Sequence, residues 1–181
     1  KNPFFNNFIF YLFFVIFIFL YILNPSQASS LLDIKKDDFY IGNEKAPVTI
    51  IEYASLSCSH CANFHINTLP KLVKEYVDTG KIKIVFRNFP FNYPALVGSM
   101  VLMCIPNDVR YQYTNALYQL QSEWVVRDNA KTTKELFKIM QSGGMTKEEF
   151  NTCIKDVELE NKILQGLMHA QKEYNINTTP S

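Results

Sequence analysis

The chain has 181 residues, a length that fits one domain or one domain with an insertion. Its 18 Lys and Arg against 17 Asp and Glu leave a formal net charge of +1. This balance argues against a nucleic-acid or anionic-surface partner, because such partners require clustered basic side chains.

The first 28 residues differ from the rest of the chain. Residues 8–23 are an uncharged, mostly apolar and aromatic run, preceded by Lys1. Small residues at Ser26 and Ala28 predict that residues 1–28 are a signal peptide cleaved after Ala28. The alternative is a retained membrane anchor, although the run is short for a hydrocarbon core of about 30 Å. Either reading places the remaining chain outside the cytoplasm.

The part that follows this leader is electrically balanced and holds all the cysteines. Removing residues 1–28 removes Lys1 and no acid, so equal numbers of basic and acidic side chains remain. The four cysteines all lie beyond the leader. An even number of cysteines in an oxidising compartment favours disulfides over structural zinc.

The next segments predict a strand, a helix and a second strand. Residues 29–45 read as a polar lead-in, and residues 47–56 as a buried strand rich in β-branched residues. Residues 81–91 read as the second strand. Between them, Pro70 should kink the helix and Gly80 should end it. The helix face expected to be apolar consists of Leu69, Leu72, Val73, Tyr76 and Val77. Together these segments predict a βαβ unit with parallel strands and a right-handed crossover.

Residues 94–174 show helical periodicity throughout. Pro106 is expected to break one helix, and Asn107 to cap the next. Thr132 or Thr133 is expected to cap a third. A block of helices is therefore predicted after the βαβ unit.

Two further signals mark the end of this block. The Gly143-Gly144 pair should end the third helix, and Thr146 to Glu149 form a capping box that opens the next. A longer amphipathic helix is predicted over about residues 156–174. The aromatic residues between 111 and 124 are expected to pack in the helical core.

The sequence Cys58-Ser59-His60-Cys61 stands where the first strand gives way to the helix. Backbone N–H groups and the macrodipole at a helix N-terminus favour an anion there. A Cys58 thiolate would thus be stabilised and its pKa lowered. His60 could add a positive charge or an N–H donor, and Cys61, one turn further, would be the buried resolving thiol. Stabilisation of the reduced thiolate makes the disulfide form a stronger oxidant.

The alternative reading of this C-x-x-C motif is half of a zinc site. A structural zinc site needs two further ligands at similar spacing. Cys104 and Cys153 are isolated, and His65 is the other nearby candidate, although it fits a helix-surface or core residue better. A redox pair without metal or other cofactor is therefore the favoured interpretation.

Three stretches together resemble the DsbA-like thiol:disulfide oxidoreductases of bacterial envelopes. They are residues 46–65, which hold the C-x-x-C motif, residues 76–90, and residues 174–180 (YNINTTP). The resemblance runs from about Asp38 to the last residue. It implies a thioredoxin-like α/β fold with an inserted all-helical domain, located in the periplasm. Many relatives have Pro-His between the two cysteines, and Ser59 in place of that proline leaves the oxidant strength open.

The resemblance assigns roles to three more residues. Glu52 matches an acid that relatives carry beneath the cysteine pair, where it could shuttle the proton of Cys61. The alternative is a solvent-facing or structurally satisfied acid. Thr179-Pro180 matches the cis-proline loop, which would place the Thr179 backbone against Cys58, ready to pair with an incoming peptide strand.

Cys104 and Cys153 lie 49 residues apart in the helical block. Cys104 is expected to end a helix before Pro106, and Cys153 to lie one turn into the helix that Thr146 opens. Some relatives carry a second, structural disulfide between such helices, and export favours one here. The alternative is two separate buried thiols.

The resemblance divides the chain into a leader at residues 1–28, the first part of a thioredoxin-like domain at 29–93, a helical insertion at 94–174, and a cis-proline segment at 175–181. It implies a dithiol oxidase that donates a Cys58–Cys61 disulfide to exported client proteins. A membrane partner of the DsbB type would reoxidise it, and a monomer is expected. The alternatives are a disulfide isomerase or reductase and, in another class, a metal-binding chaperone that uses the C-x-x-C motif.

The end of the chain also carries an expectation. A thioredoxin fold continues after its cis-proline with further strands and a closing helix, whereas Ser181 directly follows Pro180. We therefore expect Ser181 to be a truncation point. Two strands alone rarely form a stable sheet.

Overall fold

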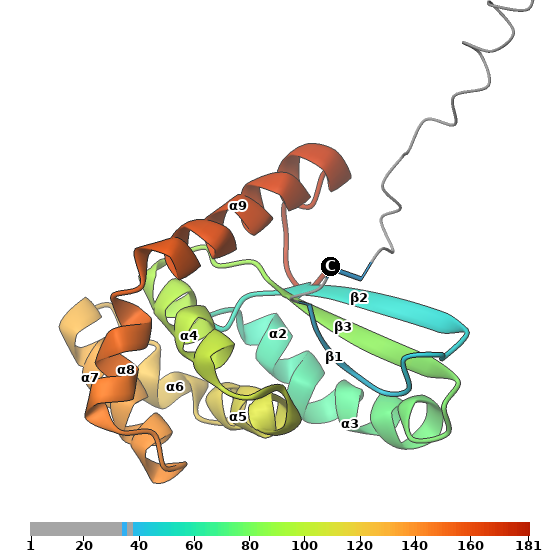
Figure 1. The fold of residues 1–181 in the computed structure, drawn as a ribbon, viewed down its shortest axis with the longest axis horizontal. Coiled ribbons are helices and arrows are strands. Elements are labelled where there is room, and N and C mark those ends of the chain that lie inside the picture. Colours follow the sequence, from blue (N-terminus) through green and yellow to red (C-terminus); the bar gives the residue numbers. More distant parts are fainter. Residues whose placement is uncertain (1–33, 36–37) are drawn as a thin grey trace, which may run out of the picture. The chain divides into compact units, whose positions relative to one another are not determined.

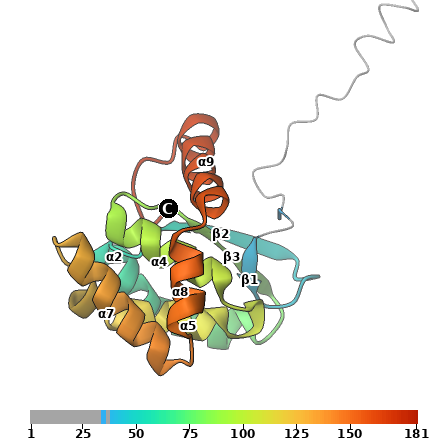
Figure 2. The ribbon, with the colours of Figure 1, turned by 60° about the vertical axis from the view of Figure 1, so that its left-hand side comes forward.

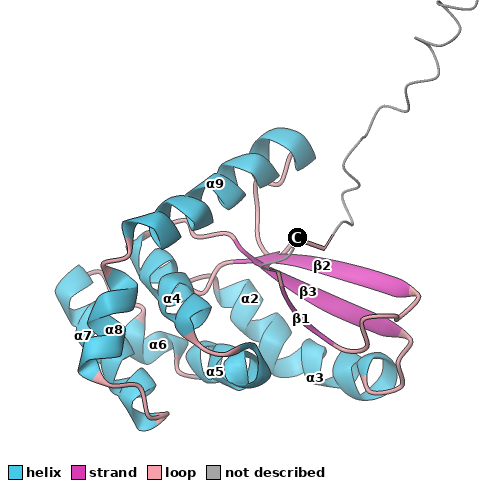
Figure 3. Ribbon diagram, viewed as in Figure 1, coloured by secondary structure: helices cyan, strands magenta, loops and turns pink. Residues whose placement is uncertain are grey.

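The computed structural model describes residues 34–35 and 38–181. The predicted signal peptide, residues 1–28, lies outside the described residues. Figures 1 and 3 show a small sheet with helices on both faces and a block of helices at one end. Within the described part, no helix combines the length and the apolar character needed to cross a membrane.

The sheet is built on the two strands that the sequence predicts. β2 (Val48–Ala54) and β3 (Ile82–Asn88) pair in parallel, with Glu52 opposite Phe86. Both are one to three residues shorter at each end than expected. A further strand, β1 (Phe39–Ile41), pairs antiparallel with the other edge of β3, giving the order β1-β3-β2. The sequence reading missed β1, because three residues are too few to show a period.

The crossover helix is continuous but not uniformly α-helical. It comprises α2 (Ser59–Asn63), the π-helical η1 (Phe64–Thr68), α3 (Leu69–Leu72) and the π-helical η2 (Val73–Val77). Pro70 lies in the first turn of α3, where a π-turn before it accommodates the missing N–H donor. Gly80, with φ +73°, follows the helix end as predicted.

The prediction of the apolar face of this helix is partly wrong. Leu69 and Val77 pack against Ile82 and Ile84 of β3, but Tyr76 is 42% exposed. The i→i+5 hydrogen bonding of η2 changes the rotation per residue, so an ideal 3.6 spacing no longer holds at Tyr76.

Helices follow β3 up to residue 174, as predicted. Their bounds are α4 (Tyr93–Cys104), α5 (Asn107–Gln119), α6 (Gln121–Trp124), α7 (Asn129–Ser142), α8 (Lys147–Ile154) and α9 (Val157–Tyr174). Two cap predictions are wrong. Pro106, not Asn107, occupies the N-cap of α5, and Asp128, not a threonine, caps α7 by accepting from the Lys131 N–H.

The remaining helix signals are confirmed. Gly143 stands at the C-cap of α7. Thr146 and Glu149 form the capping box of α8, with the Thr146 N–H donating to Glu149 Oε2 at 2.8 Å. α9 spans 18 residues and lies on the face of the sheet opposite α2 and α3 (Figures 1 and 2), where Ala170 packs on Tyr53 and Phe89.

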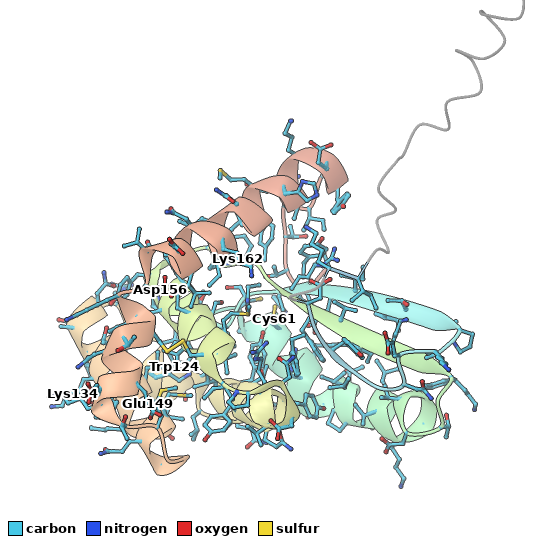
Figure 4. The ribbon with its side chains drawn as sticks, in the orientation of Figure 1. Cys61, Trp124, Lys134, Glu149, Asp156 and Lys162 are labelled. Carbon is cyan, nitrogen blue, oxygen red and sulfur yellow. A yellow bond between two sulfur atoms is a disulfide. The ribbon has the colours of Figure 1, made fainter. Side chains whose placement is uncertain are left out.

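The largest buried cluster joins the helical block to the turn that follows β2. Trp124 is fully buried, and its indole N–H donates to the Leu117 carbonyl at 2.9 Å. Leu56, just before the C-x-x-C motif, and Cys61 belong to the same cluster, and Figure 4 shows Cys61 and Trp124 in this region. Gly98 on α4 is needed here, because a Cβ would come within 2.9 Å of the Trp124 ring.

A disulfide joins Cys104 at the end of α4 to Cys153 on α8. It is visible as a yellow bond in Figure 4. Cys153 is the next-to-last residue of α8, and it therefore lies further from the Thr146 cap than the one turn expected from the sequence. The bond closes a loop that contains α5, α6, α7 and most of α8.

This disulfide should contribute measurably to stability. Replacing both Cys104 and Cys153 by Ala should lower the free energy of unfolding by about 4 kcal/mol, the chain-entropy value for a loop of this size. Urea unfolding monitored by circular dichroism measures the change. Cys153→Ala alone should lose the same amount within error, and an unchanged unfolding midpoint would contradict the expectation.

Candidate active site

The C-x-x-C motif lies at the junction of β2 and α2. Cys58 is the N-cap residue of α2, in extended conformation, and its sulfur accepts the Cys61 backbone N–H at 3.4 Å. Because α2 begins directly after Cys58, a free backbone N–H of its first turn points toward this sulfur. Both Cys58 and Cys61 are free thiols, so the structure shows the reduced form.

The end of the chain meets this motif in space. The Thr179–Pro180 peptide bond is cis, and the Cys58 thiol donates to the Thr179 carbonyl at 3.5 Å across 121 residues of sequence. Ser181 exchanges two backbone hydrogen bonds with Tyr53 of β2, at 2.8 and 3.1 Å. This pairing ties the loop to the sheet and holds Thr179 beside the sulfur.

The two thiols have opposite acidities. Burial raises the pKa of Cys58, but Thr179 and the N–H groups of Cys61 and His60 outweigh it, so this pKa lies below its ordinary value. Burial dominates for Cys61, which is 0% exposed, and raises its pKa to about 12. The Thr179 hydroxyl is buried and has no hydrogen-bond partner. Its dipole lies close to both sulfurs and acts to lower the pKa of each.

His60 contributes differently from the expectation. Its side chain is exposed, and the group that lowers the pKa of Cys58 is its backbone N–H. The stabilisation of the Cys58 thiolate therefore comes first from the Thr179 side chain and then from the N–H groups at the helix start. Cys58 is half-buried and reachable, whereas Cys61 lies in the core behind it.

A residue from the helical block holds the active-site turn. The Gln121 side-chain amide donates to the carbonyls of Leu56 at 2.8 Å and Cys58 at 3.1 Å. The sequence reading missed Gln121, because a single glutamine 63 residues from Cys58 carries no motif. It fixes the backbone on which the reactive sulfur stands.

Glu52 is buried beneath the motif, as the resemblance implies, and it has an unexpected partner. Its Oε2 lies 3.0 Å from His65 Nε2, and the two residues are 5% and 3% exposed. His65 is thus a core residue, one of the two readings that the sequence allowed. The Tyr118 ring lies 4.2 Å from the His65 ring. Burial, then the charges of Cys61, Glu52 and Cys58, raise the pKa of Tyr118, so these groups share one interior.

The residues of the candidate site do not assemble into a metal centre. Over residues 34–35 and 38–181, no group of three or more His, Cys, Asp or Glu side chains is placed to hold a metal ion. Cys104 and Cys153 are bonded to each other, away from the motif.

A thiol pair at a strand–helix junction, faced by a cis-proline loop, defines the thioredoxin class of thiol–disulfide proteins. The family model described as Thioredoxin matches residues 35–181. A solved structure, alpha-DsbA1 of Wolbachia pipientis, has a TM-score of 0.77 and 33% identity over 83% of this chain and 75% of that one. The chain belongs to the thioredoxin superfamily and, within it, to the DsbA-like proteins. The fold expected from the sequence is confirmed.

Curated relatives agree with this placement. A Rickettsia typhi protein named as a protein-disulfide oxidoreductase is 31% identical over 150 residues, 82% of this chain and 54% of the relative. Disulfide bond formation protein D of Bacillus subtilis is 28% identical over 155 residues, 78% of this chain and 64% of that protein. The chain thus spans a little over half the length of the Rickettsia relatives it matches.

The acidities can be measured directly. In the reduced protein, thiolate absorbance should rise with a midpoint below 9.0, the ordinary value, because the bound N–H groups favour the charged form of Cys58. Cys58→Ser should abolish this transition. Cys61 should remain protonated until about pH 12. A transition below 9.0 that survives in Cys58→Ser would show that the thiol of lowered pKa is not Cys58.

The role of Gln121 is also testable. Gln121→Ala should shift the thiolate midpoint of Cys58 upward, because the turn that positions its sulfur loses two hydrogen bonds. The loss of stability should be about 1–3 kcal/mol. Gln119→Ala, an exposed position at the end of α5, is the matched control and should change neither quantity. An unchanged midpoint in Gln121→Ala would show that the turn holds its geometry without the amide.

Proposed function

We propose that this protein is an oxidase of the bacterial envelope that donates disulfides to exported proteins. The observation that carries the proposal is the asymmetry of its two thiols. Cys58 is reachable with a lowered pKa, and Cys61 is buried with a pKa near 12. An oxidant needs a good leaving thiolate at the position that substrate attacks.

The proposed reaction has two exchange steps. A substrate thiolate attacks Cys58 Sγ of the Cys58–Cys61 disulfide, and the sulfur–sulfur bond breaks with its electron pair on Cys61, which then takes up a proton. A second substrate thiolate attacks the substrate sulfur of the mixed disulfide. Cys58 leaves as the stabilised thiolate, and the substrate carries the new disulfide.

The loop beside the motif supports a role in holding the substrate. Thr179 O lies 3.5 Å from Cys58 Sγ, so a peptide chain joined to that sulfur would run next to this backbone. We propose that the Thr179 backbone pairs with the peptide as an added strand. A membrane partner of the DsbB type would return Cys58 and Cys61 to the disulfide, and the protein would act in the periplasm as a monomer.

The test is oxidation of a peptide with two cysteines by the purified, oxidised protein. The wild type should convert the peptide to its disulfide, and Cys58→Ser should abolish the reaction, because no mixed disulfide can form. Cys61→Ser should abolish the reaction as well, because Cys58 alone cannot form the disulfide that oxidises the peptide. The control His169→Gln, on α9, should keep the wild-type rate.

Two outcomes would overturn the proposal. Full activity in Cys58→Ser would show that Cys58 is not the sulfur that the substrate attacks. Repair of a scrambled substrate that exceeds oxidation, together with a stable dimer, would indicate an isomerase instead.

A further inference from the structure

An open groove lies between α5 and α7 in the helical block. Its volume is about 530 Å³, within the range of about 300–1,000 Å³ that is typical of ligand sites. Its floor is apolar and consists of Tyr113, Ala116 and Leu120, with Ile139 from α7. These four side chains are only partly buried, although three of them pack against the largest core cluster. The groove therefore leaves apolar surface available to a partner.

The length of the groove floor follows from the helix that forms it. Tyr113, Ala116 and Leu120 succeed one another at spacings of three and four residues, so they share one face. Tyr113 and Leu120 are seven positions apart, which is about 10 Å along a helix that rises about 1.5 Å per residue. An extended peptide advances about 3.3 Å per residue, so about three or four of its residues would cover this floor.

One end of the groove lies beside the redox motif. Leu120 and Glu123 both line the groove, and they flank Gln121, whose side chain binds the Cys58 carbonyl at 3.1 Å. α6, which begins at Gln121, lies between α7 and the start of α2 (Figure 1). A polypeptide joined to Cys58 Sγ that leaves along α6 would thus enter this end of the groove. This continuity favours the client chain as the occupant.

The rim of the groove carries a carboxylate at the same end. Glu123 is exposed and makes no ion pair with another residue that the structure describes. On the opposite rim, the charge of Glu135 is balanced by Lys138, whose Nζ lies 2.7 Å from Glu135 Oε2. The rim is therefore negative near the redox motif and close to neutral farther along. A basic side chain of the client, placed between its cysteine and an apolar segment, complements this arrangement.

We propose that the groove between α5 and α7 binds the client polypeptide joined to Cys58, through a segment in which a basic residue is followed by apolar side chains. The proposal rests on the proposed function and names its substrate class. The Thr179 backbone holds the residues next to the reacting cysteine, and the groove holds a segment a few residues away. Apolar side chains of that segment leave water for the groove floor, which strengthens binding without any contact to the sulfur atoms.

The groove selects clients by their folding state. In a folded protein, large apolar side chains are mostly buried. An exported chain that has not yet folded exposes them and can place several of them on the groove floor. The contact is lost when the client folds, which releases the client once its disulfide has formed.

The test measures how fast peptides with one cysteine open the Cys58–Cys61 disulfide of the oxidised, full-length protein, monitored by Trp124 fluorescence. Trp124 is the one tryptophan in the sequence and packs in the cluster that contains Cys61. The first peptide has, on both sides of its cysteine, a lysine three residues away and leucines at the next three positions. The second has serines in place of the leucines. The leucine peptide should react at least about tenfold faster, the factor expected from burying a single leucine side chain.

Variants of the groove decide where this preference arises. Ala116→Lys places a charge on the apolar floor and should bring the ratio of the two rates close to one. Ile139→Gln, from the facing helix, should also lower the ratio and replaces Ala116→Lys if that variant does not fold. Gln119→Lys is the matched control, because it adds the same charge at an exposed position outside the groove, and it should keep the wild-type ratio.

A third peptide, with glutamines in place of the lysines, tests the acidic end of the groove. The lysine peptide should react about two to five times faster at low salt, as expected for an exposed ion pair, and the difference should shrink as salt is added. Glu123→Gln should remove the difference. If the difference persists in Glu123→Gln, the preference for a basic residue is overturned.

The remaining outcomes separate the docking site from the proposed function. Equal rates for the leucine and serine peptides in the wild type overturn the docking site. A preference that both Ala116→Lys and Ile139→Gln leave unchanged also overturns it, because the leucines then bind elsewhere. Equal rates together with a dimer that Ala116→Lys dissociates would identify a second copy of the chain as the occupant. If no peptide opens the disulfide, the proposed function itself is wrong, and the docking proposal falls with it.

Discussion

The rest of the site depends on where the α2 helix begins, which is between the sulfur atoms of Cys58 and Cys61. Cys58 stands outside the first turn and accepts an N–H, whereas Cys61 stands inside it and faces the core. Burial therefore raises the pKa of Cys61, whereas Thr179 and the N–H groups at the helix start lower the pKa of Cys58. Any change that moves the helix start by one residue would exchange or erase these roles.

The helical block is part of the site and not only an appendage. Trp124 and Leu56 belong to one buried cluster, and Gln121 binds the backbone on either side of Ser57. Hydrophobic packing holds the helical block against the turn that follows β2, and the two hydrogen bonds from Gln121 fix the backbone conformation of that turn. Gly98 allows the close approach, because its missing side chain leaves room for the indole ring.

Glu52 and His65 form a buried pair, and burying two such polar side chains costs free energy of folding. Two apolar side chains of similar volume would often stabilise a core as well or better. The pair lies beneath the motif and beside Tyr118, whose pKa is raised by burial and by the charge of Cys61.

The sequence by itself determined the parallel strands, the helical block and the redox motif. These follow from local signals: β-branched runs, helical periodicity, and C-x-x-C at a strand–helix junction. It also pointed to Glu52 and Pro180, but only through the resemblance to a family. Cap residues at Asn107 and the threonines were misassigned, because Pro106 and Asp128 compete for the same ends.

Only the tertiary structure decided which distant groups meet the two sulfurs. Thr179 is 121 residues from Cys58, and Gln121 is 63 residues from it, so neither contact has a local pattern. His65 and Glu52 likewise meet only because the fold places the η1 segment beside β2. A side chain's acidity depends on desolvation and on neighbouring dipoles, and both are properties of the packed interior, not of the neighbours in sequence.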